Sequence, residues 1–199
     1  MENSKIYGIL LAAGFSGRMG KFKPLLNYKG KSFVRTITEK LLAVCDEVII
    51  VTGFNSEQIE KELKENSGRE TISKVNFVFN ENYRTGMFTS LKKGIQNCSG
   101  TGWVLYHFID QPTLPFGFYE EFIKQIEDGY DWIQPAKEGK NGHPVLFGKK
   151  VIEKIEAAPD DSSLREITRA GITKKYWECG YSQIFDDLDD IEDYNKIIC

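Results

Sequence analysis

A glycine-rich, cationic loop is the segment of this sequence that is best equipped for chemistry. Glycines let the backbone approach a ligand closely, and the N–H groups of such a loop can cradle anionic oxygens. Lysine and arginine side chains add positive charge for the same purpose. All of these residues fall within ten positions: Gly14, Gly17, Arg18, Gly20, Lys21 and Lys23. The loop therefore predicts a site for a phosphorylated ligand, with a glycine-rich surface turn as the alternative.

Two better-known phosphate loops do not match this segment. The Walker A pattern requires Ser or Thr after its lysine, and here Phe22 follows Lys21. The dinucleotide fingerprint requires a glycine at the position of Ser16. It also requires an acid near the end of the second strand, where this chain has Val51-Thr52-Gly53. P-loop hydrolases and dinucleotide-binding enzymes are therefore disfavoured.

Carboxylates supply the second chemical signal. Asp110 follows the apolar run 103–109, and burying an Asp is costly without a cation or metal ion beside it. A turn cap before Pro112 is the alternative. Six acids fall within residues 186–193, a pattern that equally suits a solvated face or a helix N-terminus. The functional interpretation is that one of them completes a Mg²⁺ site with Asp110, because Mg²⁺ prefers one or two carboxylates together with waters and substrate phosphates.

Strands and helices alternate around these residues. Apolar runs typical of strands covered on both faces occupy residues 6–13, 47–52, 75–79, 103–109, 131–135 and 144–147. Helical spacing predicts helices over residues 33–44, 57–64 (with Ser56 as N-cap), 89–97 and 116–126, and a turn-rich surface loop covers 137–142. The alternation predicts a layered α/β domain with a mostly parallel sheet. The glycine-rich loop and Asp110 then both follow strands, where such sheets bind ligands.

Composition limits the remaining possibilities. The 199 residues have a net charge of −3, which argues against nucleic acid and gives no basic membrane anchor. The run 6–13 is too short to cross a membrane and has no signal-peptide cleavage pattern. Four cysteines form no C-x-x-C pair, as expected of reduced thiols. We therefore expect one domain, residues 1–199, in the cytoplasm.

Of the two histidines, His107 suits a buried structural role, and His143 suits a loop.

Five motifs, in order, resemble the signatures of the MobA-like nucleotidyltransferases, with the molybdenum cofactor cytidylyltransferases (MocA-like) as the nearer branch. They cover nearly the whole chain. The motifs are Leu11-Ala12-Ala13-Gly14-x-Ser16-x-Arg18-Met19-Gly20-x-x-Lys23, Gly86-Met87-x-x-Ser90-Leu91-x-x-Gly94, Asp110-Gln111-Pro112, Gly142-His143-Pro144-Val145-Leu146-Phe147 and Asp187-Leu188-Asp189-Asp190-Ile191-Glu192-Asp193.

The resemblance implies a three-layer α/β/α sandwich and a reaction in which a substrate phosphate attacks the α-phosphate of an NTP, Mg²⁺ assists and pyrophosphate leaves. It also implies roles for single residues. Arg18 and Lys23 would neutralise the triphosphate, and Asp110 would join them in catalysis; Asp110 and Asp189 would hold the metal; His143 would lie near the acceptor. The implied nucleotide-binding residues are Leu11, Ala12, Ala13, Gly14, Arg18, Lys23 and Ser90.

The resemblance leaves several acceptors and bases open. The first expectation is transfer of CMP from CTP to the phosphate of molybdopterin. Ala13 favours the cytidylyl branch by resemblance, but GTP, or a sugar or polyol phosphate acceptor, remains an alternative. The chain has Asn27 where the family has Pro, Ile109 where it has Gly, and Asp190-Ile191 where it has Thr-Pro. The altered terminal motif favours a further alternative, a non-catalytic accessory protein of a molybdenum hydroxylase.

Overall fold

The apolar runs of the sequence form one mixed sheet in the computed structural model, which describes residues 5–100, 102–169 and 171–198. Within these residues the strand order is β10-β7-β9-β6-β1-β4-β5, and β8 pairs with β7. The strands are β1 (Ile6–Ala12), β4 (Glu47–Thr52), β5 (Val75–Phe79), β6 (Trp103–Phe108), β7 (Trp132–Lys137), β8 (Lys140–Asn141), β9 (Val145–Phe147) and β10 (Lys174–Glu178). On this path only β9 pairs antiparallel with its neighbours, so the predicted mostly parallel, mixed sheet is confirmed.

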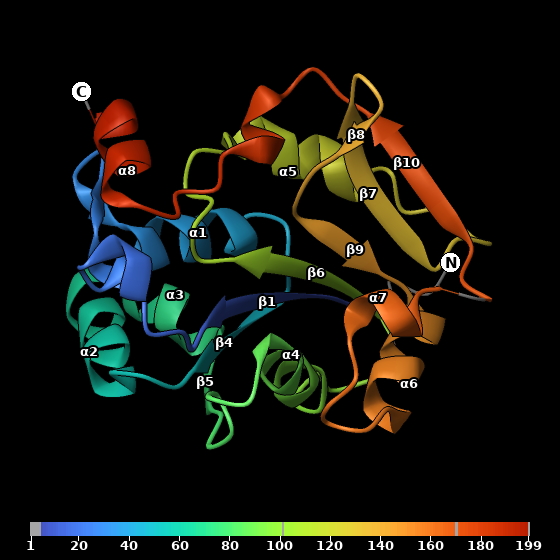
Figure 1. Cartoon of the computed structure of the whole chain (residues 1–199), viewed down its shortest axis with the longest axis horizontal. Coiled ribbons are helices and arrows are strands. Elements are labelled where there is room, and N and C mark those ends of the chain that lie inside the picture. Colours follow the sequence, from blue (N-terminus) through green and yellow to red (C-terminus); the bar gives the residue numbers. More distant parts are fainter. Residues whose placement is uncertain (1–4, 101, 170, 199) are drawn as a thin grey trace.

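Helices cover both faces of the sheet (Figure 1). They are α1 (Phe33–Leu42), α2 (Ser56–Asn66), α3 (Arg69–Ser73), α4 (Met87–Ile95), α5 (Phe116–Ile123), α6 (Lys149–Ala157), α7 (Leu164–Ile167) and α8 (Ile191–Ile198). Side chains alternate along β1, since Leu10 packs with α1, α2 and α5. Its neighbours Ile9 and Leu11 pack with α4 and α6 on the other face. The result is the expected three-layer α/β/α sandwich.

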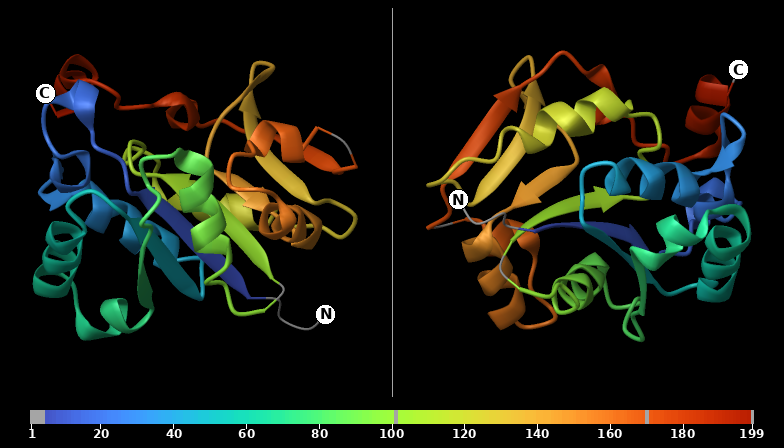
Figure 2. Two further views of the ribbon diagram at one scale, coloured as in Figure 1. Left: turned by 60° about the horizontal axis from the view of Figure 1, so that its bottom comes forward. Right: turned by 180° about the vertical axis from the view of Figure 1, so that it is seen from behind.

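The candidate site lies in a crevice beside the carboxyl end of β1. This strand pairs with β4 on one side and β6 on the other, and Leu11 lies opposite Phe108 in the β1–β6 register. The loops that leave β1 and β6 therefore begin at the same edge of the sheet and diverge. Such a switch point is where open α/β sheets bind ligands. Figure 2 shows the central strands from two further directions.

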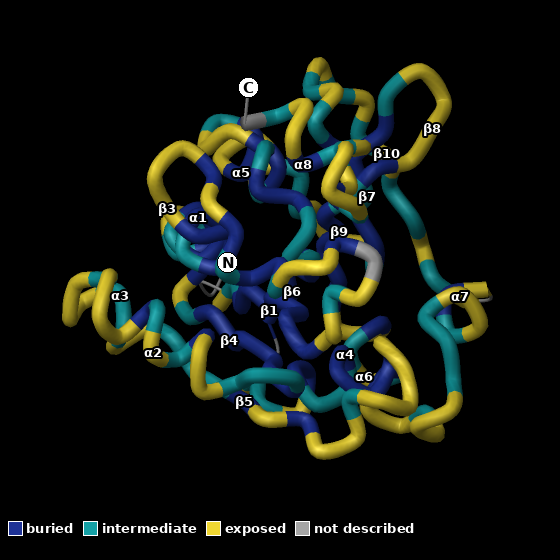
Figure 3. The backbone as a smooth tube through the Cα atoms, turned by 60° about the vertical axis from the view of Figure 1, so that its left-hand side comes forward, coloured by how far each residue is buried: buried dark blue, intermediate teal, exposed yellow. Residues whose placement is uncertain are grey.

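The innermost strands are the most buried part of the molecule. Figure 3 shows β1, β4 and β6 buried and the outer turns of α2, α3 and α7 largely exposed. A small separate hairpin of β2 (Asn27–Tyr28) and β3 (Lys31–Ser32) precedes α1.

Among the described residues, none of the helices combines the length and the apolar character needed to span a bilayer. The three cysteines in this part of the chain, Cys45, Cys98 and Cys179, are free thiols.

One local prediction is wrong. Ser56 is the first residue of α2 and not its N-cap; the cap is Asn55, which has φ 52° and makes no capping side-chain hydrogen bond. The chain turns sharply there because Phe54 donates its backbone N–H to the Ala13 carbonyl at 3.1 Å. Asn tolerates this left-handed conformation better than most residues. The turn ties the start of α2 to the loop that follows β1.

Candidate active site

The glycine-rich loop begins at the end of β1 and closes on itself. Its 3₁₀ turn, η1, spans Gly17–Met19, and the Ser16 hydroxyl accepts the backbone N–H of Lys23 at 3.0 Å. A Cβ atom placed on Gly14 or Gly17 would meet no protein atom within 4 Å. The loop backbone therefore faces open space, as a loop that receives a ligand must.

A cavity of about 350 Å³ occupies the crevice between the loops that leave β1 and β6. It collects most of the residues to which the sequence assigns a role: Leu11, Ala12, Ala13, Gly14, Lys23, Ser90, Asp110 and Asp189. Two predicted residues are not among them. The side chain of Arg18 lies outside the described part of the structure, although its backbone belongs to η1. His143 does not line the cavity but contacts Phe108, which does.

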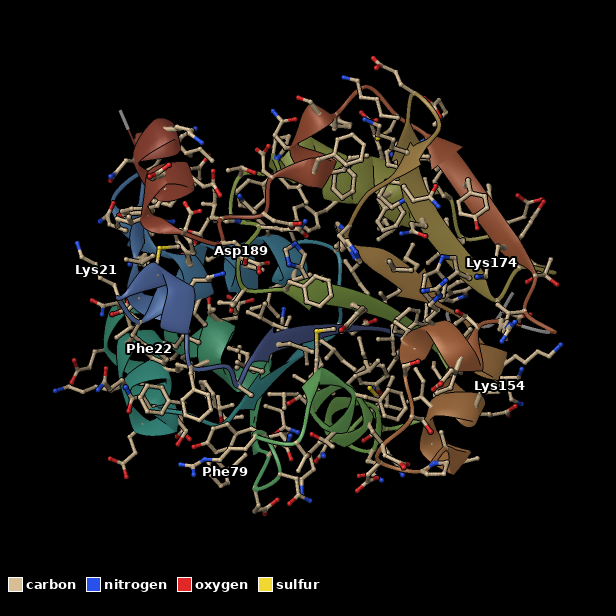
Figure 4. All side chains as sticks on the ribbon, viewed as in Figure 1. Lys21, Phe22, Phe79, Lys154, Lys174 and Asp189 are labelled. Atoms are coloured by element: carbon tan, nitrogen blue, oxygen red, sulfur yellow. The ribbon has the colours of Figure 1, made fainter. Side chains whose placement is uncertain are left out.

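Lys23 links two carboxylates that are far apart in sequence. Its Nζ donates to Asp110 Oδ2 at 3.5 Å and to Asp189 Oδ1 at 3.1 Å. The Lys23 side chain is 9% exposed and that of Asp110 is 23% exposed. Figure 4 labels Asp189 on the C-terminal segment, above the end of β6. The structure thus brings the early cationic turn and both predicted metal ligands to one place.

Main-chain and buried contacts hold residues 187–189, near the C-terminal end of the sequence, against the end of β6. Leu188 donates its backbone N–H to the Asp110 carbonyl at 3.0 Å. The buried Gln111 donates its side-chain amide to Asp187 Oδ1 at 2.7 Å. The Leu188 side chain packs in a cluster with Met19, Leu26, Tyr28, Phe33 and Tyr194. Asp189 is therefore positioned by the two residues that precede it.

The carboxylates of this site are placed where they are costly to ionise. Burial raises the pKa of Asp110, and the nearby Asp187 and Asp189 add to the rise while Lys23 opposes it. Burial likewise raises the pKa of Asp187, against the hydrogen bond from Gln111. The second oxygen of Asp110, Oδ1, is buried and has no hydrogen-bond partner among the described residues. Both observations indicate that the site has room for more positive charge than Lys23 supplies.

A divalent cation such as Mg²⁺ fits this donor set. Asp110 offers an unpaired buried oxygen, and Asp189 stands beside the same lysine amine. In the described part of the chain, no group of three or more His, Cys, Asp and Glu side chains is arranged so that it could hold a metal ion. Mg²⁺ does not need one, since substrate phosphates and waters fill most of its coordination positions. Asp110 and Asp189 are thus the residues that would hold it.

Ser90 lies in the first turn of α4 and lines the cavity, and a hydrogen bond from Asn80 holds its side chain in place. The side-chain amide of Asn80 donates to the hydroxyls of Thr89 and Ser90 at 3.0 and 2.9 Å. Asn80 is itself buried and lies just after β5. The N-terminal end of α4, which carries the positive end of the helix dipole, also borders the cavity through Gly86 and Met87.

Aromatic rings connect the glycine-rich loop to the two neighbouring loops. Phe15 lies 5.1 Å from Phe54 and 5.3 Å from Tyr83 between ring centroids, and the Arg84 guanidinium lies 5.6 Å from the rings of Phe15 and Tyr83. A Cβ atom on Gly53 would come within 2.6 Å of the Tyr83 ring, so this packing requires glycine there. Sequence reasoning missed the packing of Tyr83, the influence of Asp187 on Asp110 and the hydrogen bond from Lys23 to the Ser16 hydroxyl, because each depends on a partner elsewhere in the chain.

The two histidines differ in their surroundings. His107 is fully buried between the Phe108 carbonyl (2.7 Å) and the Tyr119 hydroxyl (2.8 Å), and burial lowers its pKa to about 3. It is therefore a neutral structural residue, as its sequence context suggests. His143 packs edge-on against Phe108 at 4.8 Å, and its Nδ1 is buried without a partner in the described residues. Its predicted role near the acceptor stays a prediction.

Lys40 fastens the loop after Asp110 to α1. Its Nζ donates to the Pro112 carbonyl at 2.5 Å, and burial, helped by Lys29, lowers the pKa of Lys40 to about 8. Between pH 8 and 10.5 the folded protein therefore binds fewer protons than the unfolded chain. Its free energy of unfolding should rise with pH across that window, by up to about 3 kcal/mol. Urea unfolding at several pH values measures this free energy. In Lys40→Met the rise between pH 8 and 10.5 should be absent.

The matched control for this measurement is Lys61→Met, because the Lys61 side chain is 72% exposed on α2. Its pH profile should follow that of the wild type. If Lys40→Met and the wild type show parallel profiles between pH 8 and 10.5, Lys40 is not the group responsible.

The chain is similar over most of its length to proteins that are already known. The family model for the MobA-like NTP transferase domain matches residues 8–175. The molybdenum cofactor cytidylyltransferase of Escherichia coli (strain K12) is 26% identical over 191 residues, which cover 96% of this chain and 94% of that protein. The "Probable molybdenum cofactor guanylyltransferase" of Bacillus cytotoxicus is 27% identical over 158 residues, which cover 78% and 75%.

Solved structures share the fold. A nucleotidyl transferase from Methanothermobacter thermautotroptrophicus has a TM-score of 0.79 at 19% identity, covering 98% of this chain and 96% of that one. The Rv0371c protein of Mycobacterium tuberculosis, crystallised as a complex with manganese, has a TM-score of 0.72 at 16% identity and covers 98% of both chains. At these identities the likeness shows the fold alone.

Proposed function

The chain belongs to the family of MobA-like NTP transferase domains, and from that premise we propose that it transfers CMP from CTP to the phosphate of a molybdopterin-type acceptor. The relative in Escherichia coli, which aligns over nearly the full length of both chains, supports this choice of base and acceptor. The observation that carries the proposal is the convergence of Lys23, Asp110 and Asp189 in the cavity at the end of β1 and β6.

The proposed reaction needs alignment and charge neutralisation more than covalent chemistry. An oxygen of the acceptor phosphate attacks the α-phosphorus of CTP, the bond to the β-phosphate oxygen breaks, and pyrophosphate leaves. The backbone of residues 11–14 would receive the nucleoside, with Ser90 beside the base, and Lys23 would turn from the carboxylates to the triphosphate together with Arg18. When bound by Asp110 and Asp189, Mg²⁺ would neutralise the phosphates and hold them in line. No protein nucleophile is required.

A thermal-shift screen of CTP, GTP, UTP and ATP with Mg²⁺ tests the choice of base. A ligand that binds only the folded state adds about 2.7 kcal/mol to the free energy of unfolding at a concentration of 100 times its Kd. We expect CTP to raise the melting temperature most, and pyrophosphate to be released from CTP only when a molybdopterin-type acceptor is present. A larger shift with GTP would contradict the choice of CTP and favour the guanylyl activity named for the Bacillus relatives.

A further inference from the structure

Asn80 is a buried amide beside the nucleotide cavity, and the proposed reaction leaves it without a role. It directly follows β5 and is 2% exposed. Its backbone N–H donates to the carbonyl of Thr52, the last residue of β4, at 2.9 Å. Asn80 does not itself line the cavity, whereas its partner Ser90 does. Any effect of Asn80 on a ligand must therefore pass through the residues to which its amide is bonded.

Two independent contacts fix the orientation of this amide. Its oxygen, Oδ1, accepts the backbone N–H of Asn82 at 3.0 Å, and a backbone N–H can only donate. The Thr89 hydroxyl donates to the backbone carbonyls of Asn82 and Gly86 at 3.1 and 2.9 Å. Carbonyls can only accept, so the single hydroxyl hydrogen of Thr89 is used there and Thr89 must accept from Asn80. The amide nitrogen of Asn80, Nδ2, thus faces α4.

The orientation of the amide sets the direction of its hydrogen bond to Ser90. Nδ2 carries two hydrogens, of which one goes to the Thr89 hydroxyl at 3.0 Å and the other to the Ser90 hydroxyl at 2.9 Å. Ser90 therefore accepts from Asn80 and keeps its own hydrogen, which its hydroxyl donates to none of the described residues. Ser90 is 3% exposed and lines the nucleotide cavity. A group in that cavity is what remains to accept this hydrogen bond.

A hydroxyl that can only donate distinguishes nucleobases by the groups on their pairing edges. Cytosine presents two neighbouring acceptors, O2 and N3, whereas guanine presents two neighbouring donors, N1–H and the 2-amino group. The Ser90 hydrogen would bond to the first and would oppose a donor on the second. An unpaired donor in a buried site costs free energy, because it has lost its water. A site of fixed hydrogen-bond direction therefore selects against the wrong partner.

We propose that Asn80 is a positioning residue for the choice of base. By donating to Ser90, it holds that hydroxyl as a donor toward the cavity, and the cavity then favours a base with an acceptor on the edge that faces α4. Asn80 touches neither the base nor the phosphates. This inference rests on the proposed function, which places Ser90 beside the base, and it identifies the group that gives this contact its direction.

Calorimetric titration of the full chain with CTP and with GTP, each with Mg²⁺, tests this role through the ratio of the two dissociation constants. Asn80→Asp keeps the side chain's shape and an acceptor for the Asn82 N–H, but it cannot donate, so Ser90 must turn its hydrogen to the new carboxylate. We expect the preference for CTP over GTP to fall about tenfold in Asn80→Asp and about fivefold in Ser90→Ala. A general loss of packing would weaken both nucleotides alike and leave the ratio unchanged.

Two controls separate hydrogen-bond direction from charge. Asn82→Asp adds the same negative charge two residues away, on an exposed residue that does not line the nucleotide cavity, so the ratio should stay at its wild-type value. In the Ser90→Ala background, Asn80→Asp should change the ratio no further, because the hydroxyl through which Asn80 acts has been removed.

The role of Asn80 is overturned by an unchanged ratio in Asn80→Asp, an equal fall in Asn82→Asp, or a further fall in the double variant. Ser90→Ala leaves the buried amide intact, and an unchanged ratio there overturns the role even if Asn80→Asp does not fold. The proposed function fails separately, if the ratio responds as expected but no pyrophosphate is released from CTP with a molybdopterin-type acceptor. Pyrophosphate release with a ratio insensitive to Asn80→Asp would retain the function and reject the role of Asn80.

Discussion

Asp110→Asn should lower turnover by about a hundredfold or more, measured as pyrophosphate release from CTP with Mg²⁺ and the acceptor. Asp110 has a buried oxygen without a partner in the described chain and lies within reach of the Lys23 amine. An amide of the same shape would keep the local packing and remove the negative charge that a metal requires. The loss should therefore appear in turnover while the protein remains folded.

The matched control for this prediction is Asp190→Asn. Asp190 belongs to the same acidic segment as Asp189, but its Oδ1 accepts the backbone N–H groups of Glu192 and Asp193 at the start of α8. Asn caps a helix about as well as Asp, so this variant should turn over like the wild type. Unchanged turnover in Asp110→Asn would remove the metal assignment. A loss of equal size in Asp190→Asn would mean that the overall negative charge matters, and not these positions.

Lys23→Met should reduce turnover by about 10²- to 10³-fold, which is the usual effect of removing one charge-stabilising donor from an active site. In the wild type the Lys23 amine lies between the two carboxylates that would hold the metal. Without nucleotide, the amine and a divalent ion therefore compete for the same oxygens. Calorimetric titration with Mn²⁺ alone should consequently show equal or tighter metal binding in Lys23→Met, even though turnover falls.

Lys21→Met provides the control for this second prediction. Lys21 is exposed and lies at the outer edge of the same turn in Figure 4, so removing its charge should change turnover only slightly. Equal losses in Lys21→Met and Lys23→Met would indicate a general attraction of the loop for anions. Weaker Mn²⁺ binding in Lys23→Met would contradict the competition between lysine and metal.

The sequence predicts the parts of this molecule that depend on local patterns. Near-continuous apolar runs identify the central strands, because β1, β4 and β6 are covered on both faces. The edge strand β10 was missed, since Lys174–Glu178 mixes charged and aromatic residues and is only partly buried. Helix α6 was also missed, since it carries its apolar side chains on one narrow face. For α8 the sequence offered only its acidic N-terminus, as one of two interpretations of residues 186–193.

The choice among the C-terminal acids could not come from local pattern alone. Asp187, Asp189 and Asp190 differ in role because Leu188 is bonded to the Asp110 backbone and the Asp190 side chain caps α8. Both facts depend on contacts between distant segments, and composition treats the three residues alike. The resemblance to a family selected Asp189, and the structure adds Asp187 as a neighbour that raises the pKa of Asp110. A smaller cavity between α4, β6 and residues 158–163 is likewise invisible in the sequence, because these three distant segments line it together.

The route by which Asp189 reaches the site has a consequence for biosynthesis. The last strand of the sheet, β10, ends at Glu178, and Asp187, Leu188 and Asp189 are synthesised after it. A nascent or truncated chain that stops after residue 178 could pair its strands, yet it would lack one of the two carboxylates and the buried Leu188 that covers Tyr28 and Phe33. Binding of a metal by both carboxylates would therefore have to wait until the segment that carries Asp189 has been made and packed against Tyr28 and Phe33.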